Sequence, residues 1–134
     1  MEKMFNNISI VAGIFGGIFS YIFGGWDTLL WTLVIFITLD YITGVLKGIY
    51  TKELSSDISF KGLIKKIVII IMIVVANTLQ RLLGDSIPIR ETVIVFYIVN
   101  EGISLLENAA VLLPNMPDKL KDVLLQLRDS EERK

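Results

Sequence analysis

The sequence predicts an all-α integral membrane protein with about four transmembrane helices and a C-terminal amphipathic helix. Three observations favour this fold class. Hydrophobic residues make up 53% of the 134 positions, they gather in long blocks, and the lysines and arginines lie in short segments between those blocks. Such an arrangement is typical of a multi-pass membrane protein rather than of a soluble domain with a large core.

Four candidate spans lie within a predicted transmembrane domain of residues 1–116, at about 8–23, 28–46, 67–83 and 92–113. A bilayer core of about 30 Å needs about 20 helical residues. The second and fourth spans meet this length, whereas the first and third are short and need flanking side chains that reach the interface. The first span is also rich in glycine, which leaves open whether it crosses the membrane or lies in its interface.

The N-terminus loosely resembles a signal peptide, because one lysine precedes an apolar segment. However, Ile8–Trp26 is a run of 19 uncharged residues. This run is longer than a usual signal core, and no A-x-A cleavage site follows it. We therefore expect the segment to be retained in the mature protein.

The basic residues predict the orientation in the membrane. Lysines follow the second span, at Lys47, Lys52, Lys61, Lys65 and Lys66, and the C-terminal tail also holds lysines and arginines. The turn at 24–27 has no basic residue and the segment 84–91 has one. Since positive residues stay on the cytoplasmic side, four crossings with both termini in the cytoplasm fit this distribution. Three crossings put the lysine-rich loop outside unless the N-terminus is outside too.

The tail, residues 117–134, predicts a short cytoplasmic helix of its own. A proline followed by an aspartate suits a first helical turn. Apolar residues then recur at helical spacing, at Leu120, Val123, Leu124 and Leu127. We expect this face to pack on neighbouring helices or on the membrane surface, with self-association through the stripe as the alternative.

Polar residues inside the predicted spans are the main functional signal. An ionisable side chain there costs about 2.5–3.5 kcal/mol on insertion, so it faces protein or water. On the fourth span the polar residues follow one helix face, which leaves Ile94, Val95 and Ile98 for the opposite side. The predicted intramembrane stripe and oligomer interface comprises Asp40, Asn77, Asn100, Glu101, Ser104, Glu107 and Asn108. From helical depth, we expect Asn77 to lie level with Asn100 or Glu101. We expect Asp40 and Glu107 to lie level with Lys47, Lys65 or Lys66 and to meet one of them.

Two interpretations of the stripe stay open, because it can pin the helices together or line a wet interface when several copies assemble. A catalytic carboxylate pair would also need a substrate pocket, and no enzyme is predicted. The chain has no cysteine and no histidine, which excludes zinc sites built from those ligands, thiol chemistry and His-based catalysis. No cofactor or metal is expected, and a net charge of −1 gives no case for nucleic acid.

Small residues spaced four apart are a second signal. They occur in or directly after the first two spans, at Gly13, Gly16, Gly17, Ser20, Gly24, Gly44 and Gly48. Such faces allow helix backbones to approach closely in lipid. They predict helix packing without identifying the partner.

Three segments, LDYITGVLKG, SSDISFKGLIKKI and FYIVNEGISLLENAAVLLPNMPDKL, resemble in order the small phage lysis holins of the type shared with clostridial toxin-secretion holins. The resemblance covers about residues 39–120. It implies a multi-pass protein of the bacterial host's cytoplasmic membrane that forms homo-oligomers and permeabilises the bilayer. The functional partner would be a cell-wall hydrolase (endolysin) or a large secreted toxin. Family-like positions are Asp40, Gly44, Ser56, Gly62, Lys66, Asn100, Glu101, Ser104, Glu107, Asn108 and Pro117. Where relatives tend to carry glycine before the proline, this chain has AAVLLPN.

Two competing hypotheses use the same features. A small regulated ion channel or transporter subunit would pass ions along the polar stripe without killing the cell. A non-pore membrane adaptor would bind a cytosolic partner through its tail.

Overall fold

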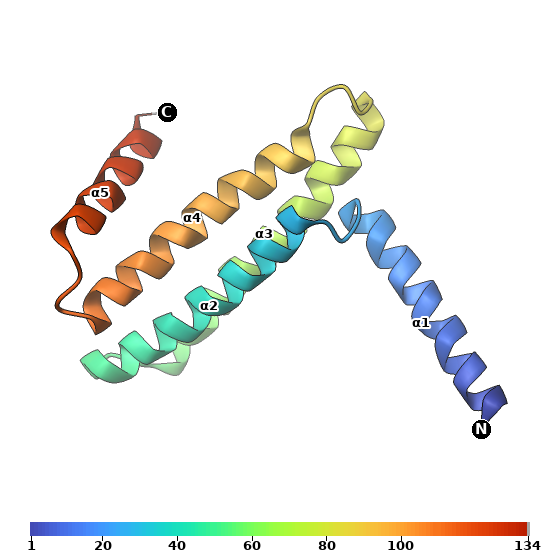
Figure 1. Ribbon diagram of the computed structural model, residues 1–134, viewed down its shortest axis with the longest axis horizontal. Coiled ribbons are helices and arrows are strands. Elements are labelled where there is room, and N and C mark those ends of the chain that lie inside the picture. Colours follow the sequence, from blue (N-terminus) through green and yellow to red (C-terminus); the bar gives the residue numbers. More distant parts are fainter. Residues whose placement is uncertain (134) are drawn as a thin grey trace.

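In the computed structural model, the chain folds into five α-helices joined by short loops (Figure 1). The helices are α1 (Glu2–Phe23), α2 (Thr28–Thr51), α3 (Ser56–Leu83), α4 (Ile89–Leu112) and α5 (Asp118–Glu132). The structure describes the backbone of residues 1–133 and the side chains of that range except at 121, 124, 127, 128, 131 and 132. No strand occurs within residues 1–133, which confirms the all-α prediction.

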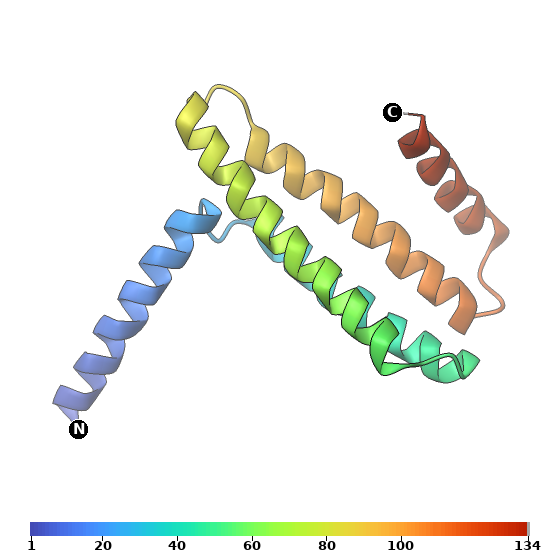
Figure 2. The same ribbon diagram turned by 180° about the vertical axis from the view of Figure 1, so that it is seen from behind.

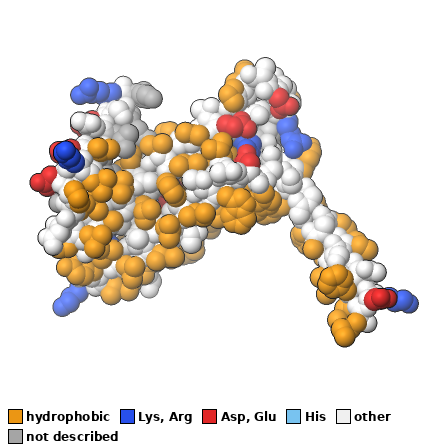
Figure 3. All heavy atoms as spheres, viewed as in Figure 1, with side chains coloured by type: hydrophobic (Ala, Val, Ile, Leu, Met, Phe, Trp, Pro, Cys, Tyr) orange, Lys and Arg blue, Asp and Glu red, His pale blue; other side chains and the backbone are white. Residues whose placement is uncertain are grey.

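Three helices, α1, α2 and α4, are long and apolar enough to cross a membrane. This agrees with the predicted class of integral membrane protein. The predicted number of about four spans also counts α3, which differs from the other three by carrying lysines through its first half. Charged side chains gather toward the ends of the molecule, and hydrophobic side chains cover α1 and the visible face between those ends (Figure 3).

Local sequence features determine where the helices begin and end. The carboxylate of Asp27 accepts a hydrogen bond from the Leu30 N–H at 3.0 Å and caps α2. The Ser55 hydroxyl caps α3 in the same way, accepting from the Ile58 N–H at 3.2 Å. Gly24 ends α1 in the left-handed conformation, with φ of 80°, which glycine adopts without strain.

Helices α2, α3 and α4 form a bundle in which α3 runs antiparallel to the other two (Figures 1 and 2). One end of the bundle holds the loop between α3 and α4, and the other end holds the loop between α2 and α3. We call these the α3–α4 end and the α2–α3 end. The apolar core comprises Phe23, Leu30, Leu33, Ile69, Ile73 and Ile94. It occupies the half of the bundle toward the α3–α4 end.

One face of α4 packs against both the apolar half and the polar half of the bundle. Ile94 is fully buried and lies seven residues before Glu101 on the same inward face. The sequence-based placement of Ile94 opposite the polar stripe is therefore wrong. The periodicity identified the face, but it did not show that the face is apolar toward the α3–α4 end and polar toward the other.

Helix α1 leaves the bundle at its C-terminal end and projects away from it (Figures 1 and 2). Its apolar side chains are exposed along most of its length, and Phe23 is its one buried residue in the described structure. Of the predicted tail stripe, Leu120 and Val123 are exposed, whereas Leu124 and Leu127 lie outside the described side chains.

Candidate functional site: two polar clusters in the helical bundle

The first polar cluster joins one charged side chain from each helix of the bundle. Lys66 of α3 donates from Nζ to Asp40 Oδ2 of α2 at 2.6 Å and to Glu101 Oε2 of α4 at 2.8 Å. Both acidic residues are buried, with 7% of Asp40 and 5% of Glu101 exposed. The lysine ammonium is therefore the group through which α3 joins α2 and α4 in this network.

A buried amide completes this cluster. Asn108 donates from Nδ2 to Asp40 Oδ1 and to Thr43 Oγ1, each at 3.0 Å. We call Asp40, Lys66, Glu101 and Asn108 the carboxylate–lysine cluster. Two carboxylates face one ammonium, so the ionised cluster carries one uncompensated negative charge. Buried ions are costly unless they are paired and hydrogen-bonded, so this cluster depends on all of its members.

The structure brings together only part of the predicted stripe. Asn100 and Glu107 are exposed and Ser104 is half-buried. Asn77 is buried but lies eleven residues beyond Lys66 on α3, about 16 Å along the helix. The prediction that Asn77 meets Asn100 or Glu101 is therefore wrong, because Asn77 bonds to α1 and Glu101 bonds to Lys66.

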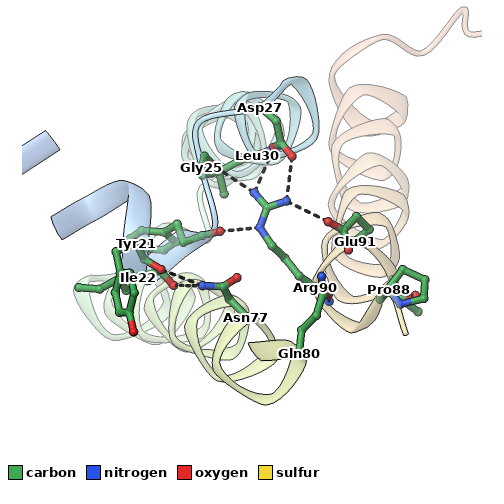
Figure 4. Close-up of polar contacts among 12 residues, drawn as sticks. Tyr21, Ile22, Gly25, Asp27, Leu30, Asn77, Gln80, Pro88, Arg90 and Glu91 are labelled. Atoms are coloured by element: carbon green, nitrogen blue, oxygen red, sulfur yellow. Dashed lines mark hydrogen bonds and ion pairs between the residues drawn. The ribbon is translucent and has the colours of Figure 1, made fainter. Parts of the chain in front are cut away.

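The second polar cluster surrounds Arg90 at the α3–α4 end (Figure 4). Arg90 is 2% exposed. Its guanidinium donates to the carbonyl oxygens of Phe23 and Gly25 and to both carboxylate oxygens of Asp27, at 2.8 and 3.1 Å. Its backbone N–H donates to Gln80 Oε1 at 2.8 Å. One side chain of α4 thus holds the whole turn between α1 and α2.

Two residues of α3 complete the contacts with the end of α1. Asn77 donates to the carbonyl oxygens of Tyr21 and Ile22 at 3.0 and 2.8 Å. Arg81 donates to the Tyr21 carbonyl at 2.9 Å and lies 3.8 Å from the centre of the Tyr21 ring. The last carbonyls of a helix lack partners within it and carry partial negative charge, so cationic and amide donors suit this position.

We call Asp27, Asn77, Gln80, Arg81 and Arg90 the Arg90 clamp. The hydrogen bond from Arg90 is the main cause that lowers the pKa of the Asp27 carboxyl below its ordinary value of 3.8. The clamp is what attaches α1 to the bundle.

The predicted small residues have different surroundings. A Cβ on Gly24 would lie 2.5 Å from Asn77 Oδ1 and 2.7 Å from Arg90 Cδ, so the clamp closes around this glycine. A Cβ on Gly48 would lie 3.0 Å from Leu54 Cδ1, and one on Gly44 would lie 3.7 Å from Asn108 Nδ2. Ser20 is half-buried. On α1, a Cβ would meet no described atom within 4 Å at Gly13, Gly16 and Gly17.

An open groove of about 790 Å³ lies between the helices toward the α2–α3 end. The carboxylate–lysine cluster forms its inner wall, Gly44, Gly48 and Gly62 also line it, and the space beside Gly62 is open. Of the five lysines predicted to be cytoplasmic in this segment, Lys47, Lys65 and Lys66 line this groove, whereas Lys52 and Lys61 are exposed outside it. Lys66 is therefore both a basic residue of this segment and a member of the buried cluster.

Sequence reasoning did not identify the clamp as a site. Asp27 follows the GGW break and Arg90 is the single basic residue of the segment 84–91. An isolated arginine where basic residues are otherwise scarce is the signal that could have identified it. Its partners are mostly backbone carbonyls, which no residue pattern identifies.

The fold and the two clusters define a small helical membrane protein with a charged network inside its bundle. Residues 17–129 match the Bacteriophage holin family, and the chain belongs to that family. Membership in this family points to a non-enzymatic membrane protein.

The chain is 46% identical over 132 residues to a 14.9 kDa protein from the nagH 3′ region of Clostridium perfringens, covering 98% of this chain and 100% of the relative. It is 45% identical over 111 residues to a protein of Listeria monocytogenes, covering 83% and 79%. A protein of Bacillus phage phi105 named probable holin is 31% identical over 115 residues, covering 86% and 84%. No solved structure matches the chain.

Proposed function

We propose that this protein is a holin that forms homo-oligomers in the bacterial cytoplasmic membrane and permeabilises it. The released partner is a cell-wall hydrolase or a large toxin. The observation that carries this proposal is the carboxylate–lysine cluster, a charged network buried among helices whose outer surface is apolar. A helix bundle that only anchors a protein has no need of such a network, since each buried ion is costly.

Four crossings with both termini in the cytoplasm are part of the proposal. Lys47, Lys52, Lys61 and Lys65 all lie toward the α2–α3 end, whereas the α3–α4 end has Arg81 and Arg90, both engaged with the end of α1. The positive-inside rule then assigns the α2–α3 end to the cytoplasm. In this orientation α3 is the third span, although its lysines shorten its apolar part.

The mechanism rests on the cost of the buried charges. In a single chain the bundle itself satisfies the carboxylate–lysine cluster, so the monomer is tolerable in lipid. Asn100 lies outside that network and is exposed on α4. Contact with another copy removes the cost of exposing this amide to lipid. If α2, α3 and α4 separate within an assembly, the charged face lines a wet opening rather than facing hydrocarbon.

Induced expression in a bacterium that holds a cytoplasmic endolysin tests the proposal. We expect abrupt lysis that requires both proteins, together with loss of membrane potential when this protein is expressed alone. A selective conductance that the cells survive would instead favour the channel or transporter subunit.

Deletion of residues 117–134 separates the adaptor from the hole-forming protein. A holin lacking this segment still causes lysis, with altered timing. An adaptor that acts through the tail loses all activity.

A further inference from the structure

The groove at the α2–α3 end carries an arrangement of charge that the proposed function does not use. Two of its lysines, Lys47 and Lys65, line it from opposite helices. Within the described part of the chain neither ammonium makes a hydrogen bond or ion pair, whereas the ammonium of Lys66 is fully engaged. Two free cations in one groove of about 790 Å³ attract an anion.

The position of these lysines along the helices indicates the depth in the bilayer at which the groove lies. Lys47 directly follows the predicted second span, and Lys65 lies two residues before the predicted third span. Both therefore lie where a span meets the headgroup region. Ile58, Ile64 and Val68 also line the groove, and they are exposed to the surroundings of the bundle. The groove thus combines basic groups at headgroup depth with an apolar wall beside them.

We propose that this groove binds an anionic phospholipid, with its phosphate between Lys47 and Lys65 and an acyl chain along the apolar wall. Basic pockets between membrane helices on the cytoplasmic side take such headgroups. The hydroxyl of Ser59 lies on the same lining and can donate to a phosphate oxygen.

Negative groups on the lining restrict where the phosphate sits. Glu53 lines the groove from the loop between α2 and α3, and the inner wall carries the two carboxyl groups of the carboxylate–lysine cluster. The phosphate therefore binds toward the lysines and away from Asp40 and Glu101. Removing the Glu53 charge is expected to strengthen binding.

The test uses purified full-length protein taken from bilayers of phosphatidylcholine with a minor fraction of phosphatidylglycerol. Native mass spectrometry measures which lipid each chain retains. We expect wild type to retain phosphatidylglycerol selectively. The double variant Lys47→Gln/Lys65→Gln should lose affinity by about fivefold for each lysine removed, from about 1 kcal/mol per basic residue. Glu53→Gln should retain more of this lipid than wild type.

The matched control is Lys52→Gln/Lys61→Gln, because both lysines are exposed on the same end and neither lines the groove. This variant should keep the selectivity. Gly62→Leu is a second test that leaves the charge unchanged. Gly62 lines the groove and a Cβ there would meet no described atom within 4 Å, so a leucine side chain should enter the groove and block the lipid.

Three results overturn the proposal. The first is equal loss of selectivity in the two double variants, which would indicate non-specific surface attraction. The second is displacement of the lipid by soluble inorganic phosphate, which would indicate a site for free phosphate. The third is a cross-link between Gly13→Cys on one copy and Gly62→Cys on another, formed by a protein that retains no lipid selectively. This result would show that α1 of a second copy fills the groove. The chain has no native cysteine, so the cross-link has no background.

The inference rests on the proposed orientation but not on hole formation. Lipid retention is measured without lysis, so failure of the lysis experiment and failure of lipid binding are separate outcomes.

Discussion

The two polar clusters of this bundle have different roles at different levels: the Arg90 clamp lies at the α3–α4 end, and the carboxylate–lysine cluster lies near the middle of α2 and α4. In the Arg90 clamp, Arg90 and Asn77 donate hydrogen bonds to backbone carbonyls at the end of α1. The last carbonyls of a helix have no hydrogen-bond partner within the helix. In the carboxylate–lysine cluster, side chains from three helices satisfy one another, and two carboxyl groups share one ammonium. The clamp therefore fixes a helix end, whereas the cluster holds helices together at a cost that another arrangement can relieve.

The largest expected effect comes from removing the shared cation. Lys66→Met leaves two buried carboxylates without a counter-ion, and breaking a buried pair in this way costs about 3–5 kcal/mol. We expect a loss of this size in the free energy of unfolding measured in mild detergent. Lys61→Met is the control, because Lys61 is exposed, and it should change stability by less than about 0.5 kcal/mol. Equal effects of the two changes would show that Lys66 is not the link between the helices.

Breaking the clamp should lower the free energy of unfolding by less than Lys66→Met does, and its effect should be confined to α1 and the turn after it. Arg90→Met removes charge-assisted hydrogen bonds to Asp27 and to two carbonyls, but the Asp27 side chain is 46% exposed, so water can replace part of what its carboxylate loses. We expect faster proteolysis at Gly24–Gly25 and increased mobility of a spin label on α1, with little change in the rest of the bundle. Arg81→Met, which removes one carbonyl contact and the stacking on Tyr21, should have a smaller effect in the same assays. A label on α1 that stays unchanged in Arg90→Met would contradict the role of the clamp.

The two asparagines of α4 allow a comparison within one helix. Asn108→Ala removes the donor to Asp40 and Thr43, and a buried acceptor left unsatisfied costs about 1–3 kcal/mol. Asn100→Ala changes an exposed amide and should leave the unfolding free energy of the monomer within about 0.5 kcal/mol. Unfolding of both variants in detergent measures the difference. If Asn100→Ala were the more destabilising change, the division of the stripe into buried and exposed parts would be wrong.

The smallest expected effect is a weakening of the Arg90 clamp at acidic pH. Because Arg90 lowers the pKa of Asp27 in the folded chain, the ionised carboxylate stabilises the fold at neutral pH. This contribution is lost as the pH falls through the folded-state pKa, which lies below 3.8. We expect proteolysis at Gly24–Gly25 to increase over that acidic range in wild type. In Asp27→Asn the rate should already be raised at neutral pH and should change less on acidification.

The sequence predicted the helices and the chemical character of the site better than its contacts. Apolar blocks and polar spacing identified the all-α membrane class, and they marked Asp40, Glu101 and Asn108 as members of one polar network. Helical depth alone could not predict that Lys66 would reach both carboxylates, because a long lysine side chain spans levels that the rise per residue separates. Likewise, Asn77 donates to backbone carbonyls of α1. Every residue has a backbone carbonyl, so the residue types in the sequence do not identify such a partner.

The same comparison explains the outcome for the small residues. Spacing of four predicts close helix packing, yet Gly24 lies against the Arg90 clamp and Gly48 lies against Leu54 of the following loop. Gly13 and Gly17 have no close contact with another part of the described chain. Packing partners supplied by a second copy would not appear within one chain, so the predicted faces on α1 stay predictions.

The most direct test of the account compares lysis timing in Asp40→Ala, Glu101→Ala and Val95→Ala at equal protein levels, with a cytoplasmic endolysin present. Val95 is the suitable control because it is exposed on α4, whereas Ile94 belongs to the core. If the carboxylate–lysine cluster governs when the membrane opens, the two carboxylate variants shift the onset or extent of lysis and Val95→Ala matches wild type. Lysis curves that coincide for all three variants would contradict the claim.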